Sequence, residues 1–210
     1  MSPLKIPPGW KPTYARFVTS KQPNKAKRYR VQLTCGGNLV HYPGNVSTPT
    51  AALTTAKIVL NSTISRPRSR FMAIKVKKIY LGTNMDRYKY MLIAIHLIPA
   101  KIIDQYNLNN IAKNGYVLVE IWKGMYGLPQ AGKLAHNQLV KHLATFGYHP
   151  VKHTAGLWRR TTRDIVFCLV VNDFGVRYNK EQDVKHLISA LTTRYKITTD
   201  WNGSNTLAWT

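Results

Sequence analysis

The residues of this chain whose types could support chemistry lie at one short polar turn. Asn172 and Asp173 separate two apolar segments, residues 167–171 and 174–176, and this pattern predicts two strands joined by a hairpin turn. A carboxylate and an amide at the tip of a hairpin offer oxygen ligands, which are the ligands that hard divalent cations prefer. Asn-Asp is also an ordinary turn sequence, so these residues alone leave both interpretations open.

The charge of the chain indicates a polyanionic partner. Lys and Arg total 31 against 8 acids, a formal net charge of +23, and the first 85 residues contain no Asp or Glu. Neutralising phosphates and releasing their counterions is the usual source of nucleic-acid affinity. An anionic membrane surface is the competing partner, but the sequence contains no strong basic amphipathic helix that would lie on one. We therefore expect nucleic acid rather than a membrane.

The composition predicts a globular protein in a reducing compartment. Hydrophobic residues make up 44% of the 210 residues and charged residues 19%, whereas disordered chains are poor in apolar residues. Cys35 and Cys168 match no metal-binding spacing, and no hydrophobic signal region or membrane-length apolar run is present. The expected location is the cytoplasm or nucleus. The sequence does not determine the oligomeric state.

Periodicity predicts strands and helices that alternate along the chain. Residues 1–28, rich in Pro and Lys, predict an extended, weakly ordered arm, and residues 29–40 predict a hairpin that turns at Gly36-Gly37-Asn38. Helices are expected over residues 50–61 and 99–106, before Gly147, and from Val184 to Leu191; strands are expected over residues 71–81, 116–122 and 195–199. This order predicts an α+β fold whose mixed or antiparallel sheet is covered by helices on one face. No linker requires two independent domains.

Three motifs in this order resemble the reverse transcriptase of copia-like retrotransposons, an RNA-directed DNA polymerase. In chain order they are the Tyr80-Leu81 pair, the segment Tyr126 to Gly132, and the Asn172-Asp173 hairpin. The resemblance runs from about residue 29 to 201. It implies a fingers and palm domain over residues 29–210, with the fingers mainly in residues 29–70 and part of 82–120 and a ferredoxin-like sheet in the palm. No thumb, ribonuclease H or integrase segment is expected.

The resemblance also implies three catalytic carboxylates that hold two Mg²⁺ or Mn²⁺ ions. The first position, five residues before Tyr80, is Lys75, and the consecutive pair is Asn172 and Asp173. The family trio carries three negative charges, whereas these three residues sum to zero. At about 4 Å and an effective dielectric constant near 20, an ammonium repels a divalent ion by roughly 8 kcal/mol. We therefore expect little or no template-primed nucleotidyl transfer, with Asp173 as a residual metal ligand.

The resemblance assigns nucleotide and template contacts to other residues, each with a structural alternative. Tyr80 matches a steric gate beneath the incoming sugar, or else is a core aromatic at a strand end. Gln130 and Gly132 match a turn that contacts template and nucleotide, or else belong to a helix start whose bend is set by neighbouring Gly and Pro residues.

Basic residues of the expected finger hairpin complete this assignment. Lys27, Arg28 and Arg30 match a grip on the triphosphate, or else form a solvated basic face; Gln32 stands where relatives commonly have a further arginine. The leading hypothesis is therefore a truncated, inactive copia-like reverse transcriptase whose family partners are an RNA or DNA template-primer and deoxynucleoside triphosphates. The alternatives are a non-catalytic basic nucleic-acid-binding module and a reading frame that yields no stably folded protein.

Overall fold

The computed structural model describes residues 6–22 and 28–203, and the chain divides into two compact units. Unit 1 comprises residues 1–46 and 80–134, and unit 2 comprises residues 47–79 and 135–210, so the chain passes from unit 1 into unit 2, returns to unit 1, and enters unit 2 again. No single linker separates the units, because neither unit is continuous in the sequence. Residues 47–70, which were expected in the fingers, belong to unit 2.

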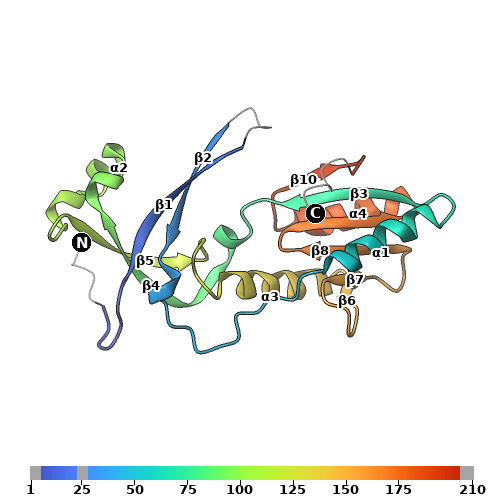
Figure 1. Cartoon of the computed structure of the whole chain (residues 1–210), viewed down its shortest axis with the longest axis horizontal. Coiled ribbons are helices and arrows are strands. Elements are labelled where there is room, and N and C mark those ends of the chain that lie inside the picture. Colours follow the sequence, from blue (N-terminus) through green and yellow to red (C-terminus); the bar gives the residue numbers. More distant parts are fainter. Residues whose placement is uncertain (1–5, 23–27, 204–210) are drawn as a thin grey trace. The chain divides into compact units, whose positions relative to one another are not determined.

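Unit 1 contains a four-stranded sheet in the order β2-β1-β4-β5 (Figure 1). Its strands are β1 (Thr13–Lys21), β2 (Tyr29–Cys35), β4 (Asn84–Ala94) and β5 (Tyr116–Lys123), and helix α2 (Ala100–Gln105) lies between β4 and β5 in the chain. β1 pairs antiparallel with β2 and, over its first two residues, parallel with β4. A buried cluster lies beneath this sheet: Cys35, Met85, Met91, Ile121, Met125, Leu128 and Ala131.

Two expectations for the N-terminal part are wrong. The expected arm contains β1, and β2 pairs with this preceding strand instead of with residues 39–40. The chain cannot turn back after β2, because the N–H of Cys35 donates to the carbonyl of Tyr126 (2.9 Å) and the N–H of Gly36 to that of Tyr14 (2.9 Å). Residues 37–39 form a 3-10 helix instead.

Unit 2 contains a six-stranded antiparallel sheet in the order β10-β3-β9-β8-β7-β6. Its strands are β3 (Arg70–Val76), β6 (His149–Pro150), β7 (Leu157–Arg159), β8 (Ile165–Val170), β9 (Asp173–Tyr178) and β10 (Ile197–Asp200). The helices are α1 (Leu53–Ile64), α4 (Glu181–Thr192) and α3 (Ala131–Ala144), which begins in unit 1. The succession β3-α3-β8-β9-α4-β10, with strand order β10-β3-β9-β8, is the ferredoxin-like arrangement. The expected α+β fold is therefore confirmed.

Aromatic rings fill one face of the unit 2 sheet. Phe167 stacks on Trp158 with ring centroids 5.7 Å apart and contacts the ring of Tyr148 at 5.9 Å. Tyr148 in turn contacts His186 of α4, so α4 covers this face. Burying each of these large side chains stabilises the fold by roughly 1.5–3 kcal/mol.

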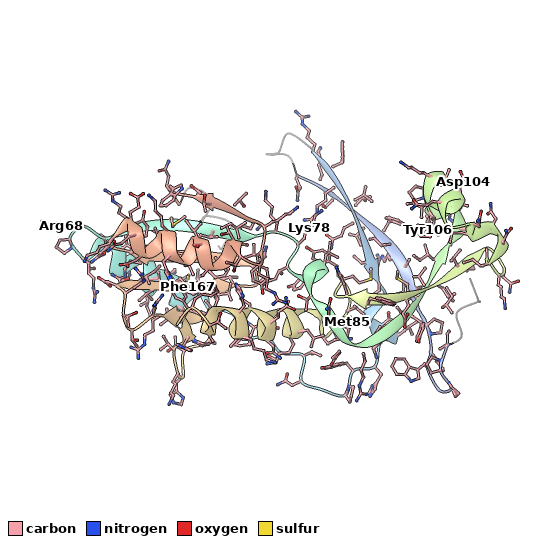
Figure 2. All side chains as sticks on the ribbon, turned by 180° about the vertical axis from the view of Figure 1, so that it is seen from behind. Arg68, Lys78, Met85, Asp104, Tyr106 and Phe167 are labelled. Atoms are coloured by element: carbon pink, nitrogen blue, oxygen red, sulfur yellow. The ribbon has the colours of Figure 1, made fainter. Side chains whose placement is uncertain are left out.

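Helix α1 covers the opposite face, which was not expected. Its Ala56 and Val59 pack against Cys168, and neighbouring residues of a strand such as Phe167 and Cys168 point to opposite faces of the sheet. Figures 1 and 2 view the molecule from opposite sides, with α1 in front of the sheet in the first and α4 in the second. Among the described residues, no helix is both long and apolar enough to cross a bilayer.

Candidate functional site at the β8–β9 hairpin

A two-residue turn places Asn172 and Asp173 at one end of the unit 2 sheet. Val170 pairs with Asp173, so Val171 and Asn172 alone form the connection between β8 and β9. Val171 has a φ of 57°, which a β-branched residue rarely adopts, and a positive φ at the first central position alone is typical of a type II′ turn. The turn therefore fixes where β9 begins and which side of the sheet Asp173 faces.

Lys75 faces Asp173 across the β3–β9 pair. The two residues are directly opposite each other in the register, and the Lys75 Nζ donates to Oδ1 of Asp173 at 2.7 Å and to Oδ2 at 3.0 Å. The side chains are 57% and 28% exposed, respectively. Both oxygens of the carboxylate are thus engaged by one ammonium at the surface of the unit.

Asn172 holds the turn against the end of β3. Its Nδ2 donates to the carbonyl of Val76 at 2.9 Å, and the N–H of Val76 donates to the carbonyl of Asn172 at 2.9 Å. Val76 follows Lys75 by one residue, so the structure brings Lys75, Asn172 and Asp173 together at one end of β3 and β9. The family resemblance implies that these three positions meet, whereas their local sequences do not.

These residues do not fit a pair of divalent ions. Asp173 is the one carboxylate of the three, and an ion that approached it would meet the ammonium of Lys75. Within residues 6–22 and 28–203, no group of three or more His, Cys, Asp or Glu side chains is arranged to hold a metal. The three side chains carry no net charge, so they lack the negative charge that a pair of divalent ions requires.

Tyr80 belongs to unit 1, whereas Lys75 and Asp173 belong to unit 2. It begins the 3-10 helix Tyr80–Gly82 and meets the ring of Tyr126 edge-on, with centroids 5.4 Å apart. Burial raises the pKa of Tyr80, and the neighbouring Tyr126 raises it further. Because Tyr80 packs against the buried cluster of unit 1, its contacts support a core aromatic.

The segment that carries Gln130 and Gly132 is fixed by backbone packing. Gly127 has a φ of 96°, and a Cβ placed there would collide with the carbonyl oxygen of Cys35. Gln130 immediately precedes α3, and its carbonyl accepts from the N–H of Leu134 at 3.0 Å. These contacts support the interpretation of the segment as a bend that starts a helix, and Gly132 lies within α3.

The side chain of Gln130 is not explained by that interpretation. It is fully buried, and neither atom of its amide has a hydrogen-bond partner among the described residues. Leaving a buried polar group unpaired costs about 1–3 kcal/mol. Pro129, beside Gln130, is typical of a helix start, but the burial of the Gln130 side chain has no local sequence signal.

The β1–β2 ribbon places Arg30 on an exposed face. Arg30 pairs with Ser20 and Thr34 with Arg16, so Arg16 and Arg30 lie on the same side of the ribbon. Arg28 lies at the end of the ribbon, where its carbonyl accepts from the N–H of Gln22 at 2.6 Å, and Lys27 lies outside the described residues. Sequence reasoning missed Arg16, because β1 itself was not foreseen.

Comparison with known proteins leaves the family open. No family model matches the chain, and no curated protein matches it. One solved structure that is similar to it is an apo telomerase from Candida tropicalis, truncated from its C-terminal domain, with a TM-score of 0.42 and 11% sequence identity. The similarity covers 76% of this chain and 37% of that chain. This distant likeness does not by itself indicate a function.

Proposed function

We propose that this chain is the fingers and palm of a copia-like reverse transcriptase that has lost nucleotidyl transfer and still binds nucleic acid. The observation that carries the proposal is the ion pair of Lys75 with Asp173, directly across β3 and β9. The family resemblance implies a carboxylate at both positions, and the ferredoxin-like succession of strands and helices agrees with a polymerase palm.

The loss of activity follows from charge. Two-metal phosphoryl transfer needs carboxylates that hold two divalent ions close together, and here a cation replaces one carboxylate and an amide another. Each 1.36 kcal/mol of lost transition-state stabilisation lowers the rate tenfold. The repulsion of roughly 8 kcal/mol between an ammonium and a divalent ion at about 4 Å is therefore enough to abolish useful turnover, even if the exposed lysine swings away and removes half of it.

Retained affinity for nucleic acid follows from the charge of both units. Unit 1 contains 14 Lys and Arg against 3 acids, and unit 2 contains 17 against 5. Such an excess attracts the phosphate backbone without regard to sequence. A basic binding module with no polymerase ancestry is the second candidate, and the excess of cations in both units, which requires no polymerase ancestry, is the observation that favours it.

Two measurements on one substrate test the proposal. A poly(rA)·oligo(dT) template-primer is first titrated with the protein by fluorescence anisotropy at several salt concentrations, and binding that weakens steeply with salt is expected. The same complex is then supplied with dTTP and either Mg²⁺ or Mn²⁺, with an active reverse transcriptase as the positive control. No extension is expected; extension by this chain overturns the loss of activity, and absence of binding overturns the retained affinity.

A further inference from the structure

Unit 1 contains a cavity of about 370 Å³ that plays no part in the hairpin site. Its wall is formed by the turn before β1, the segment after β2 and the middle of β4. The wall contains two aromatic residues, three cations and a histidine, and no carboxylate: Trp10, Tyr90, Lys11, Arg87, Lys89 and His41. Aromatic rings together with unpaired cations are the combination that binds single-stranded nucleic acid.

A tight turn presents Trp10 to this cavity. The N–H of Trp10 donates to the carbonyl of Pro7 at 3.1 Å, and Gly9 between them has a φ of 80°. Pro8 and a positive-φ glycine at the two central positions are typical of a type II turn. Trp10 meets the ring of Tyr90 edge-on at 6.2 Å and remains 39% exposed. Part of the indole is therefore free to contact a base.

Lys89 adds a cation beside the indole. Its Nζ lies 4.8 Å from the centroid of the Trp10 ring and donates to the carbonyl of His41 at 3.1 Å. An ammonium has three donors, so two remain for a phosphate. Cation and aromatic ring are thus held in one place before any ligand arrives.

The other cations of the wall are also free of ion pairs. Within the described part of the chain, neither Lys11 nor Arg87 forms a salt bridge with a carboxylate. The neighbouring Asp86 accepts from the backbone N–H of Arg87 at 2.9 Å and from the hydroxyl of Tyr42 at 3.1 Å. Each of its two oxygens therefore already accepts a hydrogen bond, and Asp86 does not line the cavity.

We propose that this pocket binds a segment of single-stranded nucleic acid, with one base against Trp10 and the adjoining phosphates on Lys89 and Arg87. The proposal rests on the nucleic-acid affinity proposed above and adds a specific location for a single strand in unit 1. The side chains of an acidic peptide would use the cations but would offer no aromatic ring to stack on the indole, so the aromatic residues favour nucleic acid.

Anisotropy with a fluorescein-labelled oligothymidylate of about eight nucleotides tests the pocket. Trp10→Ala is expected to weaken binding about tenfold, because stacking on an aromatic side chain contributes that much per base. Trp10→Phe is expected to retain affinity within about threefold, which separates loss of stacking from misfolding. Trp201→Ala, which removes another exposed indole from unit 2, is the matched control and should leave binding unchanged.

The cations are tested through the dependence of affinity on salt. Lys89→Gln and Arg87→Gln should each reduce the slope of log K against log salt by about 0.7, the value for one phosphate of a single strand. Irradiation of an oligonucleotide that carries 5-iododeoxyuridine should attach it to the peptide that contains Trp10 or to the one that contains Tyr90. Adducts confined to other peptides, or a Trp10→Ala variant that binds like the wild type, overturn the proposal.

Two further outcomes distinguish failure of the pocket proposal from failure of the proposed function. If the wild type binds the poly(rA)·oligo(dT) template-primer but not the oligothymidylate, the pocket is refuted and the proposed function stands. If it binds neither, the proposed function fails as well. Displacement of the oligothymidylate by poly-glutamate, with the same dependence on Trp10, would identify an acidic peptide as the ligand and overturn the assignment to nucleic acid.

Discussion

The ammonium of Lys75 contacts both carboxylate oxygens of Asp173, at 2.7 and 3.0 Å, from the directly opposite position of the neighbouring strand. The only carboxylate at the hairpin site is thereby neutralised by the residue that stands where the resemblance implies another carboxylate. Lys75 has two effects: it supplies no carboxylate at its own position, and its ammonium occupies the carboxylate of Asp173.

Restoring the acids should create a cation site. Lys75→Asp combined with Asn172→Asp would bring three carboxylates to one end of β3 and β9, and we expect the affinity for Mn²⁺ to rise roughly tenfold or more, because an adjacent repulsive charge becomes an attractive one. Isothermal titration calorimetry measures the change. Lys152→Asp with Asn114→Asp, at exposed turn positions, alters the net charge equally and serves as the control. Equal affinity in both double variants would show that the three side chains do not share an ion.

A methyl group at Gly127 should destabilise unit 1. Gly127→Ala would place a Cβ against the carbonyl of Cys35 at a φ of 96°, and we expect the free energy of unfolding to fall by about 2 kcal/mol or more. Urea unfolding followed by circular dichroism measures the loss. Gly82→Ala is the control, because a Cβ there has no atom within 4 Å. Equal midpoints for the two variants would contradict the close approach of these segments.

The part of unit 2 from β8 to β10 could be predicted because its strands and helix follow one another with clear signals, whereas β6, β7 and the position of α1 on the opposite face were not predicted. The apolar runs of β8 and β9 flank a polar turn, and the helical spacing from Val184 to Leu191 marks α4. The meeting of Lys75 with Asp173 followed from the family pattern. That Asn172 binds the carbonyl of Val76 depends on the exact register of β3 and β9, which the local sequence does not fix.

The strands of unit 1 were harder to predict from the sequence, because they pair with strands that are distant in the chain. β1 lies among prolines and cations and is recognisable only by its partner β2, and the register of β4 shifts between Asn84 and Lys89, which interrupts the alternation that marks a strand. The pocket beside Trp10 had no sequence signal, because it joins residues from three separate segments.

Acidification should weaken the packing of α4 through His186. Burial lowers the pKa of His186 from its ordinary value of 6.5, and the cations of Arg160 and Arg163 lower it further, while Asp183 opposes them. The ring also contacts the hydroxyl of Tyr148 at 3.0 Å. The unfolded chain then binds a proton more readily than the folded one, so this contribution to stability is present above pH 6.5 and is lost as the pH falls below it.

Urea unfolding at a series of pH values between about 5 and 7.5 tests this effect. His186→Gln removes the titrating group, and its stability should change less with pH over this range than that of the wild type. His149→Gln, at an exposed position, controls for the loss of any one histidine. A pH profile for His186→Gln that parallels the wild type would contradict the assignment.

The two thiols should be unreactive in the folded protein. Cys35 of unit 1 and Cys168 of unit 2 are buried, and burial raises the pKa of each to about 11, whereas the thiolate is the reactive form. At pH 8 we expect labelling by a thiol reagent to be at least a hundredfold slower than that of an added cysteine at the exposed Thr161. Mass spectrometry identifies which thiol is labelled.

The same thiols report on each unit separately when labelling is repeated across a urea series. Because the Cβ of an alanine at position 127 would meet the carbonyl of Cys35 itself, Gly127→Ala should move the labelling of Cys35 to lower urea at least as far as that of Cys168. The opposite order, with Cys168 labelled first in the variant, would place the damage in unit 2. Rapid labelling of Cys35 in the native wild type would refute the packing of β2 against the Tyr126 segment.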